Sequence, residues 1–276
     1  LIIYLFFILF RILGYKNASN FGAIIGSLFG PLFRSKELIL NNLKNAFPNL
    51  DKYELVKTSK NMWSNYGRIL SDYVFIKDFR NSKLKEFISI EGEEIFKEIK
   101  ETKKPVVFIS GHFNNFELMA MQIEMSGIDL ATIYRPLNNI FINVIMEKIR
   151  KKYICKNQIK KGMQGMRELL SMFKNGTSVA LMIDQRVSEG IKSNFFGTKA
   201  YTTTIPAQFV KKFNCKIVPI YIERVLGINF KINVEKPIEY QKDDSLEKIT
   251  QDLNLRLEKM ILKNPGQWIW SHNRWK

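Results

Sequence analysis

A histidine followed at a fixed distance by a carboxylic acid is the clearest sign of chemistry in the sequence. His112 follows Gly111 and stands five positions before Glu117, within PVVFISGHFNNFELMAM at residues 105–121. Histidine suits proton transfer because its unperturbed pKa lies near neutrality. If His112 stands at the leading edge of a helix, Glu117 lies about one turn further along and can hold one imidazole nitrogen while the other faces substrate. The spacing therefore predicts that His112 and Glu117 act together as a general base.

Other interpretations of these residues remain open, because HxxxxE alone is a weak motif. In the plainest alternative, His112 is a core histidine whose hydrogen bonds are satisfied. Ser110, Cys155 and Cys215 are the other candidate nucleophiles, but none lies in a GxSxG pattern and neither cysteine has a histidine nearby in sequence. We therefore expect direct attack by an activated hydroxyl, without a covalent acyl-enzyme. The cysteines also lack ligand or disulfide spacing, which predicts free thiols and no zinc site.

The segments that must position this motif alternate between strand-like and helix-like runs. Strands are predicted at residues 105–110, 130–134, 178–184, 216–224 and 230–239. Helices are predicted at residues 53–76, 115–125, 139–152, 163–173, 205–213 and 246–263. This alternation favours an α/β fold with a central, largely parallel sheet flanked by helices. Ligands bind such sheets at the carboxyl ends of the strands, and His112 directly follows one of them.

The first 33 residues are more apolar than the rest of the chain. LIIYLFFILF at residues 1–10 and FGAIIGSLFGPLF at residues 21–33 are two apolar runs, each shorter than the ~20 residues of a transmembrane helix. Basic residues follow the first run, which by the positive-inside rule places the remaining chain in the cytoplasm. These basic residues are Arg11, Lys16, Arg34 and Lys36. We predict a membrane-associated helical region at residues 1–33 and one catalytic α/β domain at residues 34–276; the alternative is an amino-terminal core helix.

The charge is strongly basic, with 43 Lys and Arg against 26 Asp and Glu and a formal net charge of +17. Such a surface attracts anionic lipids, phosphorylated substrates, nucleic acid or an acidic carrier protein, although biased composition accounts for part of the excess. The stretch at residues 147–161 carries seven Lys and Arg against one Glu. It either docks an acidic carrier or an anionic bilayer, or is a solvated helix face. A membrane-tethered, non-enzymatic nucleic-acid-binding protein is the alternative of another class, but no basic segment interleaved with aromatics supports it.

The sequence resembles the lipid A biosynthesis late acyltransferases, the lauroyl and myristoyl transferases. GHFNNFEL at residues 111–118 is similar to their GHFGNWE-type motif, and the similarity covers nearly the whole chain. Further similar segments are NNLKNAFPNL (41–50), NYGRILSDY (65–73), YRPLNN (134–139), DQR (184–186), FFGTKAYTTTIPA (195–207) and QWIWSHNRWK (267–276). Asn114 and Ile205 depart from the family pattern at positions where Gly is commoner, without removing a reactive group.

The resemblance implies an enzyme at the inner membrane, with its catalytic domain facing the cytoplasm. It would move a fatty acyl chain from acyl carrier protein to a hydroxyl of a phosphorylated glycolipid, the lipid A precursor, in the secondary acylation of lipopolysaccharide biosynthesis. No cofactor, metal or nucleic acid is implied. The alternative acceptors are a phosphatidylinositol mannoside or a lysophospholipid. Glycerolipid acyltransferases normally show HxxxxD and a later EG motif, so Glu117 argues against them.

Four further polar residues are predicted to bind substrate: Asn115, Arg135, Asp184 and Arg186. Arg135 ends a predicted strand, where a guanidinium can clamp a phosphate or stabilise the thioester oxyanion. Arg186 occupies a similar position after Asp184, whose carboxylate either joins the site or pairs with an arginine. Asn115 either donates a hydrogen bond to the acceptor or caps the following helix.

The carboxyl-terminal segment is assigned to structure rather than chemistry. His272 has no carboxylate close to it in sequence. Its neighbouring tryptophans suit packing better than binding. These are Trp268, Trp270 and Trp275.

Overall fold

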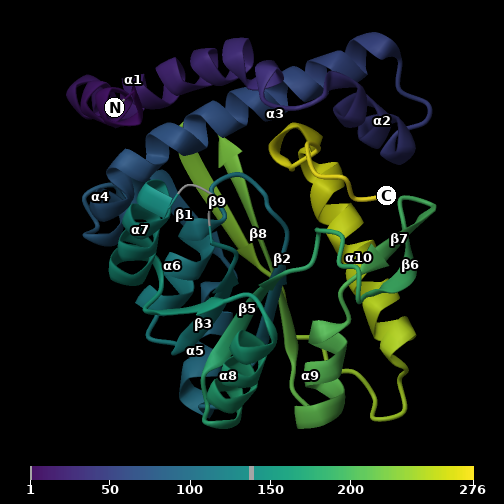
Figure 1. Ribbon diagram of the computed structural model, residues 1–276. Coiled ribbons are helices and arrows are strands. Elements are labelled where there is room, and N and C mark those ends of the chain that lie inside the picture. The colour runs from purple at the N-terminus through teal and green to yellow at the C-terminus, as the bar shows by residue number, and fades with distance from the viewer. Residues whose placement is uncertain (1, 137–139) are drawn as a thin grey trace.

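Within residues 2–136 and 140–276, which the computed structural model describes, seven strands form one central sheet flanked by helices (Figure 1). The strand order is β1-β9-β8-β2-β5-β3-β4, and every neighbouring pair is parallel except β8 with β9. The strands are β1 (Ile88–Glu91), β2 (Val107–Ser110), β3 (Leu130–Tyr134), β4 (Asn157–Lys160), β5 (Ser178–Met182), β8 (Ile217–Val225) and β9 (Asn229–Val234). The predicted α/β class and largely parallel sheet are thus confirmed.

The central strands could be predicted from the sequence because they are buried and therefore consist of continuous apolar residues. Every residue of β2 is buried, as expected for a strand covered on both faces of a parallel sheet. The edge strands β1 and β4 were not predicted, because each has only four residues and is partly exposed. A separate antiparallel hairpin, β6 (Ile191–Phe195) and β7 (Thr198–Thr202), was also not predicted.

The helices predicted at residues 163–173, 205–213 and 246–263 are present with nearly those bounds, whereas the helices at residues 36–46, 76–80 and 93–102 were not predicted. The α-helices after residue 35 are α2 (Lys36–Ala46), α3 (Lys52–Asp72), α4 (Ile76–Arg80), α5 (Glu93–Thr102), α6 (Glu117–Met125), α7 (Ile140–Ile149), α8 (Met163–Lys174), α9 (Ile205–Phe213) and α10 (Leu246–Lys263). Asn139, the predicted start of α7, lies outside the described residues, and a π-helical turn at Arg150–Ile154 follows this helix. α6 begins at Glu117 and not at residue 115, because Asn114 has a left-handed backbone with φ 45°.

Element α1 (Ile2–Phe29) consists of two helical segments that are separated at Gly14, whose backbone is non-helical with φ 71° and ψ 163°. One amino-terminal apolar run lies before this break, and the other lies after it and continues through a 3₁₀ turn, η1 (Gly30–Leu32). One side of α1 packs on α3 and contributes Phe10, Tyr15 and Ala18 to the same hydrophobic core as the sheet. The inner face of α1 is therefore part of the hydrophobic core. No helix within the described ranges is both long and apolar enough to cross a bilayer.

Helices α1 and α3 lie over the carboxyl ends of the central parallel strands (Figure 1). In Figure 1 both helices cross the top of the molecule, at the end of the sheet toward which β8 points. β2 and β5 run parallel to β8 and to each other, so the segments that leave them emerge at this same end.

Candidate functional site

His112 and Asp184 leave the sheet side by side. β2 ends at Ser110 and β5 at Met182, and these two residues are register partners. The backbone N–H of Ile183 donates to the carbonyl of Ser110 at 2.9 Å, which extends the pairing by one residue. Parallel strands with a common edge therefore bring together two residues that are 72 positions apart in sequence.

The carboxylate of Asp184 holds the imidazole of His112. Nδ1 of His112 lies 2.8 Å from Oδ1 of Asp184, and the backbone N–H of His112 donates to Oδ2 at 2.7 Å. The indole N–H of Trp268 also donates to Oδ2, at 2.9 Å. Asp184 is fully buried, whereas the His112 side chain keeps 22% of its surface exposed. The ring is thus fixed through one nitrogen, packs edge-on against Phe116 and keeps part of its surface exposed.

This arrangement corrects the predicted contact between Glu117 and His112. Oε1 of Glu117 accepts hydrogen bonds from Tyr73 Oη at 2.5 Å and Arg150 Nε at 2.8 Å, and Arg150 Nη2 lies 2.6 Å away. The chain between His112 and Glu117 is not a regular helical turn, because the helix starts only at Glu117. Asp184, which was predicted to bind substrate or pair with an arginine, makes the expected contact instead.

The electrostatics of the pair favour a charged imidazole. Burial of the His112 ring lowers its pKa, but the charge and the hydrogen bond of Asp184 raise it and prevail, so the pKa of His112 lies above its ordinary value of 6.5. The charge of Glu117 adds to this increase and that of Arg150 opposes it. Burial raises the pKa of Asp184, yet the charge and hydrogen bonds of His112 outweigh it and the net shift is downward.

The other predicted substrate-binding residues are more scattered. Arg135 is exposed at the end of β3, and the last residues of its motif, 137–139, lie outside the described residues. Arg186 Nε donates to the carbonyl of Lys276 at 2.8 Å, while its backbone N–H contacts His272 Nε2 at 3.2 Å. Arg186 is therefore tied to the carboxyl-terminal segment rather than paired with Asp184.

Asn115 lies behind the site and not on its surface. Its side chain is fully buried and Nδ2 donates to Asp72 at 3.2 Å. Asp72 in turn forms a buried ion pair with Arg224. The predicted hydrogen bond from Asn115 to the acceptor is not available in this arrangement, because its amide is used inside the protein.

Three residues near His112 were not predicted to belong to its site: Tyr73, Arg150 and Trp268. Arg150 was noticed only as part of a basic stretch, but the π-helical turn directs its guanidinium to Glu117, where the side chain is 15% exposed. Such turns often occur at functional sites. Trp268 was assigned to packing, and its indole N–H to Asp184 could not be read from local sequence.

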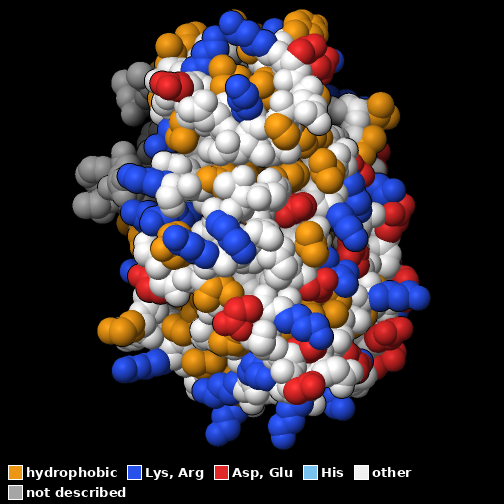
Figure 2. Space-filling model, turned by 90° about the vertical axis from the view of Figure 1, so that its right-hand side faces the viewer, with side chains coloured by type: hydrophobic (Ala, Val, Ile, Leu, Met, Phe, Trp, Pro, Cys, Tyr) orange, Lys and Arg blue, Asp and Glu red, His pale blue; other side chains and the backbone are white. Residues whose placement is uncertain are grey.

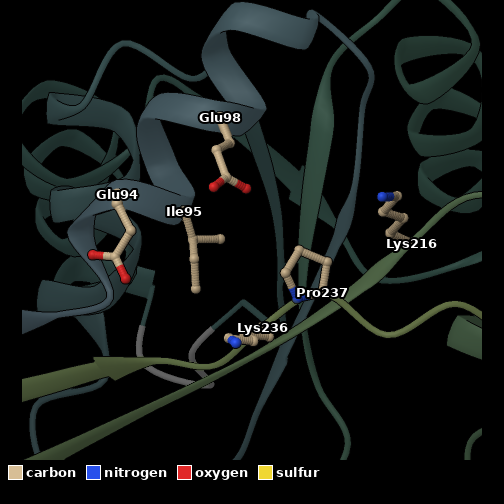
Figure 3. A pocket seen from close by; sticks show the side chains of 6 residues that line it. All are labelled: Glu94, Ile95, Glu98, Lys216, Lys236 and Pro237. Carbon is tan, nitrogen blue, oxygen red and sulfur yellow. The ribbon is translucent and has the colours of Figure 1, made fainter.

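Two cavities of the described part of the protein lie away from His112. One cavity of about 350 Å³ is lined by residues of α5 and the segment after β9, and Figure 3 shows its lining side chains. A neighbouring cavity of about 620 Å³ shares Glu98, Lys216 and Pro237 with it. Its lining reaches Val106 and Lys216, the residues that precede β2 and β8, so both cavities lie at the opposite end of the sheet from His112. Among the described residues, no three His, Cys, Asp or Glu side chains gather as metal ligands would.

The fold and the His112–Asp184 pair define an α/β protein suited to acid–base chemistry at its strand ends. Comparison with known protein families is more specific. The bacterial lipid A biosynthesis acyltransferase family matches residues 1–276, and the chain belongs to this family. The resemblance predicted from its motifs is thereby confirmed. Membership makes the chain an acyl-transferring enzyme of lipid A biosynthesis, which favours the enzymatic prediction over a nucleic-acid-binding protein.

Curated relatives agree with this assignment at low identity. A lipid A biosynthesis palmitoleoyltransferase of Escherichia coli (strain K12) is 22% identical over 261 residues, covering 92% of this chain and 83% of its own. A lipid A biosynthesis lauroyltransferase of the same organism is 23% identical over 249 residues, which cover 88% of this chain and 79% of the relative. A lipid A biosynthesis acyltransferase of Haemophilus influenzae is 22% identical over 262 residues, which cover 91% of this chain and 83% of the relative.

Proposed function

We propose that the protein transfers a fatty acyl chain from acyl carrier protein to a hydroxyl of a lipid A precursor, with His112 as general base. The 2.8 Å contact between His112 Nδ1 and the buried Asp184 is the observation that carries this proposal. An ionised carboxylate can only accept hydrogen bonds, so in the neutral ring Nδ1 bears the proton and Nε2 keeps a free lone pair. A substrate hydroxyl that reaches Nε2 can therefore give up its proton there.

In the proposed reaction a C–O bond replaces the C–S bond, and the proton of the acceptor hydroxyl ends on the departing thiol. The acceptor oxygen attacks the thioester carbonyl carbon while Nε2 of His112 takes the hydroxyl proton. The C–S bond then breaks, and the imidazolium returns the proton to the departing thiolate, leaving an ester and a thiol. Asp184 orients the ring and stabilises the imidazolium through their hydrogen bond, and Glu117 adds negative charge nearby. No covalent acyl-enzyme is needed.

Arg135 is proposed to clamp an anionic oxygen of the thioester or of an acceptor phosphate, because it is exposed at the same end of the sheet as His112. Lysine lacks the planar fork for bidentate binding, so Arg135→Lys should lose about tenfold or more in rate. Steady-state acyl transfer measures this loss, with circular dichroism as the control for folding. Turnover of the folded variant near that of the wild type would reduce Arg135 to a surface charge.

The proposed location is the cytoplasmic side of the inner membrane, with residues 1–33 at the bilayer. Support comes from the exposed apolar residues of α1 and η1 and from the lack of Asp and Glu in residues 1–36. The net charge of +17 suits an acidic carrier and a phosphorylated acceptor. Lys151 and Lys152 are exposed next to Arg150, which offers a docking place for the carrier beside the site.

The test is acyl transfer by purified protein from loaded acyl carrier protein to a detergent-dispersed lipid A precursor, followed by mass spectrometry. The wild type should add one acyl chain, and His112→Ala should lose ~10²–10⁴-fold in rate. Circular dichroism checks that the variant is folded. A folded His112→Ala protein within a few-fold of the wild type would remove the general-base assignment. A wild type that acylates a lysophospholipid or a phosphatidylinositol mannoside instead would overturn the proposed acceptor.

A further inference from the structure

The segment that follows α10 contacts both sides of the His112–Asp184 pair. The carbonyl of Gln267 accepts the backbone N–H of Asn114, two residues after His112, at 2.9 Å. The indole N–H of the next residue, Trp268, donates to Asp184 at 2.9 Å. Two adjacent residues therefore hold the loop that carries His112 and the carboxylate that orients its ring. We call residues 111–116, between β2 and α6, the His112 loop.

The side chain of Gln267 ties the His112 loop to strand β8. Its Oε1 accepts the backbone N–H of Arg224 and an Nδ2–H of Asn114, each at 2.7 Å, and its Nε2 donates to the carbonyl of Arg224 at 2.9 Å. The ladder between β2 and β8 ends with Ile109 and Pro219, so Arg224 lies beyond it. The amide of Gln267 thus takes the place of a neighbouring strand and bridges the end of β8 to the loop that leaves β2.

The chemistry of this bridge suits a side-chain amide. A backbone N–H can only donate and a backbone carbonyl can only accept, so a side chain that pairs with both must offer an acceptor and a donor side by side. The backbone that it grips is itself held in place, because the side chain of Arg224 forms a buried ion pair with Asp72. Asp72 also accepts a hydrogen bond from Asn115 of the His112 loop.

The His112 loop depends on such contacts because it is irregular. Asn114 has a left-handed backbone with φ 45°, and α6 begins only at Glu117. On the side of the molecule that carries α10 and the C-terminus, Figure 2 shows basic, acidic and hydrophobic side chains interspersed on the surface. What distinguishes the segment after α10 is therefore its inward contacts, through Gln267 and Trp268, with the His112–Asp184 pair.

We propose that Gln267 is a positioning residue of the acyl transfer, which sets the place of His112 against Asp184 by fixing the His112 loop to the end of β8. The imidazole and the carboxylate keep their 2.8 Å contact only while both are held in one frame. Gln267 and Trp268 supply that frame together. A displacement of a reacting group by about 1 Å can cost ~10²-fold in rate. This inference rests on the general-base role proposed above for His112 and adds a residue that acts through it.

Gln267→Met tests this role, since methionine keeps the length of the side chain but cannot form the three hydrogen bonds. The kcat should fall about tenfold or more, while KM for donor and acceptor changes less than about threefold, because the position of the base is altered and not substrate binding. The titration midpoint of the His112 ring should move to lower pH, since a looser contact weakens the attraction by Asp184 that raises its pKa. Initial rates and NMR of the imidazole measure the two effects.

Asn42→Leu is the matched control. Asn42 is a buried amide on α2 that holds the same C-terminal segment, by donating to the carbonyls of Trp270 and His272 at 2.8 Å each. Its loss should lower stability, yet leave kcat within about twofold and the midpoint of His112 unchanged. Equal losses of kcat in the two variants would show a general loosening of the segment and would overturn the specific role of Gln267.

Asn114→Gly decides if Gln267→Met does not fold. Glycine readily adopts φ 45° and removes the side-chain bond to Gln267, while the backbone bond stays. Its kcat should fall about threefold at unchanged KM. Wild-type kcat with an unshifted midpoint, in whichever variant folds, overturns the proposal. Failure of the general-base proposal would look different, as a fully active His112→Ala protein, whereas the midpoint of His112 would still move in Gln267→Met.

Discussion

Two buried carboxylates, Asp184 and Glu117, influence the pKa of His112, and they accept hydrogen bonds from different groups. Asp184 accepts hydrogen bonds from the backbone and the ring of His112 and from Trp268. Glu117 accepts hydrogen bonds from Tyr73 and from the guanidinium of Arg150. The charge of Glu117 is thus matched by a permanent cation, whereas that of Asp184 is matched only when the imidazole is protonated.

This difference shows that a short distance in sequence does not predict which carboxylate contacts a histidine at the end of a strand. Glu117 shares a motif with His112, but Asp184 reaches it because β2 and β5 are adjacent parallel strands. Asp184 therefore suits the orienting role, and the Glu117–Arg150 pair suits a fixed local field. Substitutions that keep the shape of each carboxylate and remove its charge can separate the two roles.

Asp184→Asn should cause the larger loss of activity. An amide at this position no longer stabilises the imidazolium and can favour the wrong tautomer, so acyl transfer should fall ~10²–10⁴-fold while the fold is kept. Because the two residues act as a unit, His112→Ala combined with Asp184→Asn should be no worse than His112→Ala alone. Initial rates of the two single variants and the double variant measure this. Losses that multiply would mean that Asp184 works independently of His112.

Glu117→Gln should affect stability more than Asp184→Asn does, and activity less. The change leaves the guanidinium of Arg150 buried without its carboxylate, which costs about 3–5 kcal/mol in the free energy of unfolding. The rate should fall only about tenfold, because the hydrogen bond to the imidazole remains. Urea unfolding measures the loss of stability, and initial rates of acyl transfer measure the loss of activity. A larger rate loss than in Asp184→Asn, with stability unchanged, would return the orienting role to Glu117.

Local patterns predicted most of the fold, and contacts across the chain account for what they missed. α9, α10 and β3 have the predicted bounds, because their apolar periodicity and end signals are complete within one segment. His112 was identified from its motif and its position after a strand. The contact between Asp184 and His112 was not predicted, because it depends on the order of the strands in the sheet. The hydrogen bond from the Trp268 indole was not predicted either, because Trp268 lies far from both residues in sequence. Glu117 was misplaced because helix spacing was applied across Asn114, whose φ is positive.

The smallest expected effect is a shift in titration, and it bears directly on the two carboxylates. The chain has two histidines, so their imidazole resonances can be assigned by comparison with His112→Ala. The pKa of His112 should lie above 6.5, despite burial, because Asp184 favours the charged ring. The pKa of His272 should lie below 6.5, chiefly because burial disfavours its charged form. The acid limb of the rate profile should follow His112, since a general base is inactive once protonated.

The same titration in the two variants completes the comparison. In Asp184→Asn, the largest influence that raises the pKa of His112 is gone while burial still lowers it, so its midpoint should move down strongly. In Glu117→Gln, a weaker attraction is lost and Arg150 remains as a repelling charge, so the midpoint should move down by less. The acid limb of acyl transfer should move with each midpoint. If both variants shift equally, Glu117 acts on the imidazole as strongly as Asp184, and the division of roles between them fails.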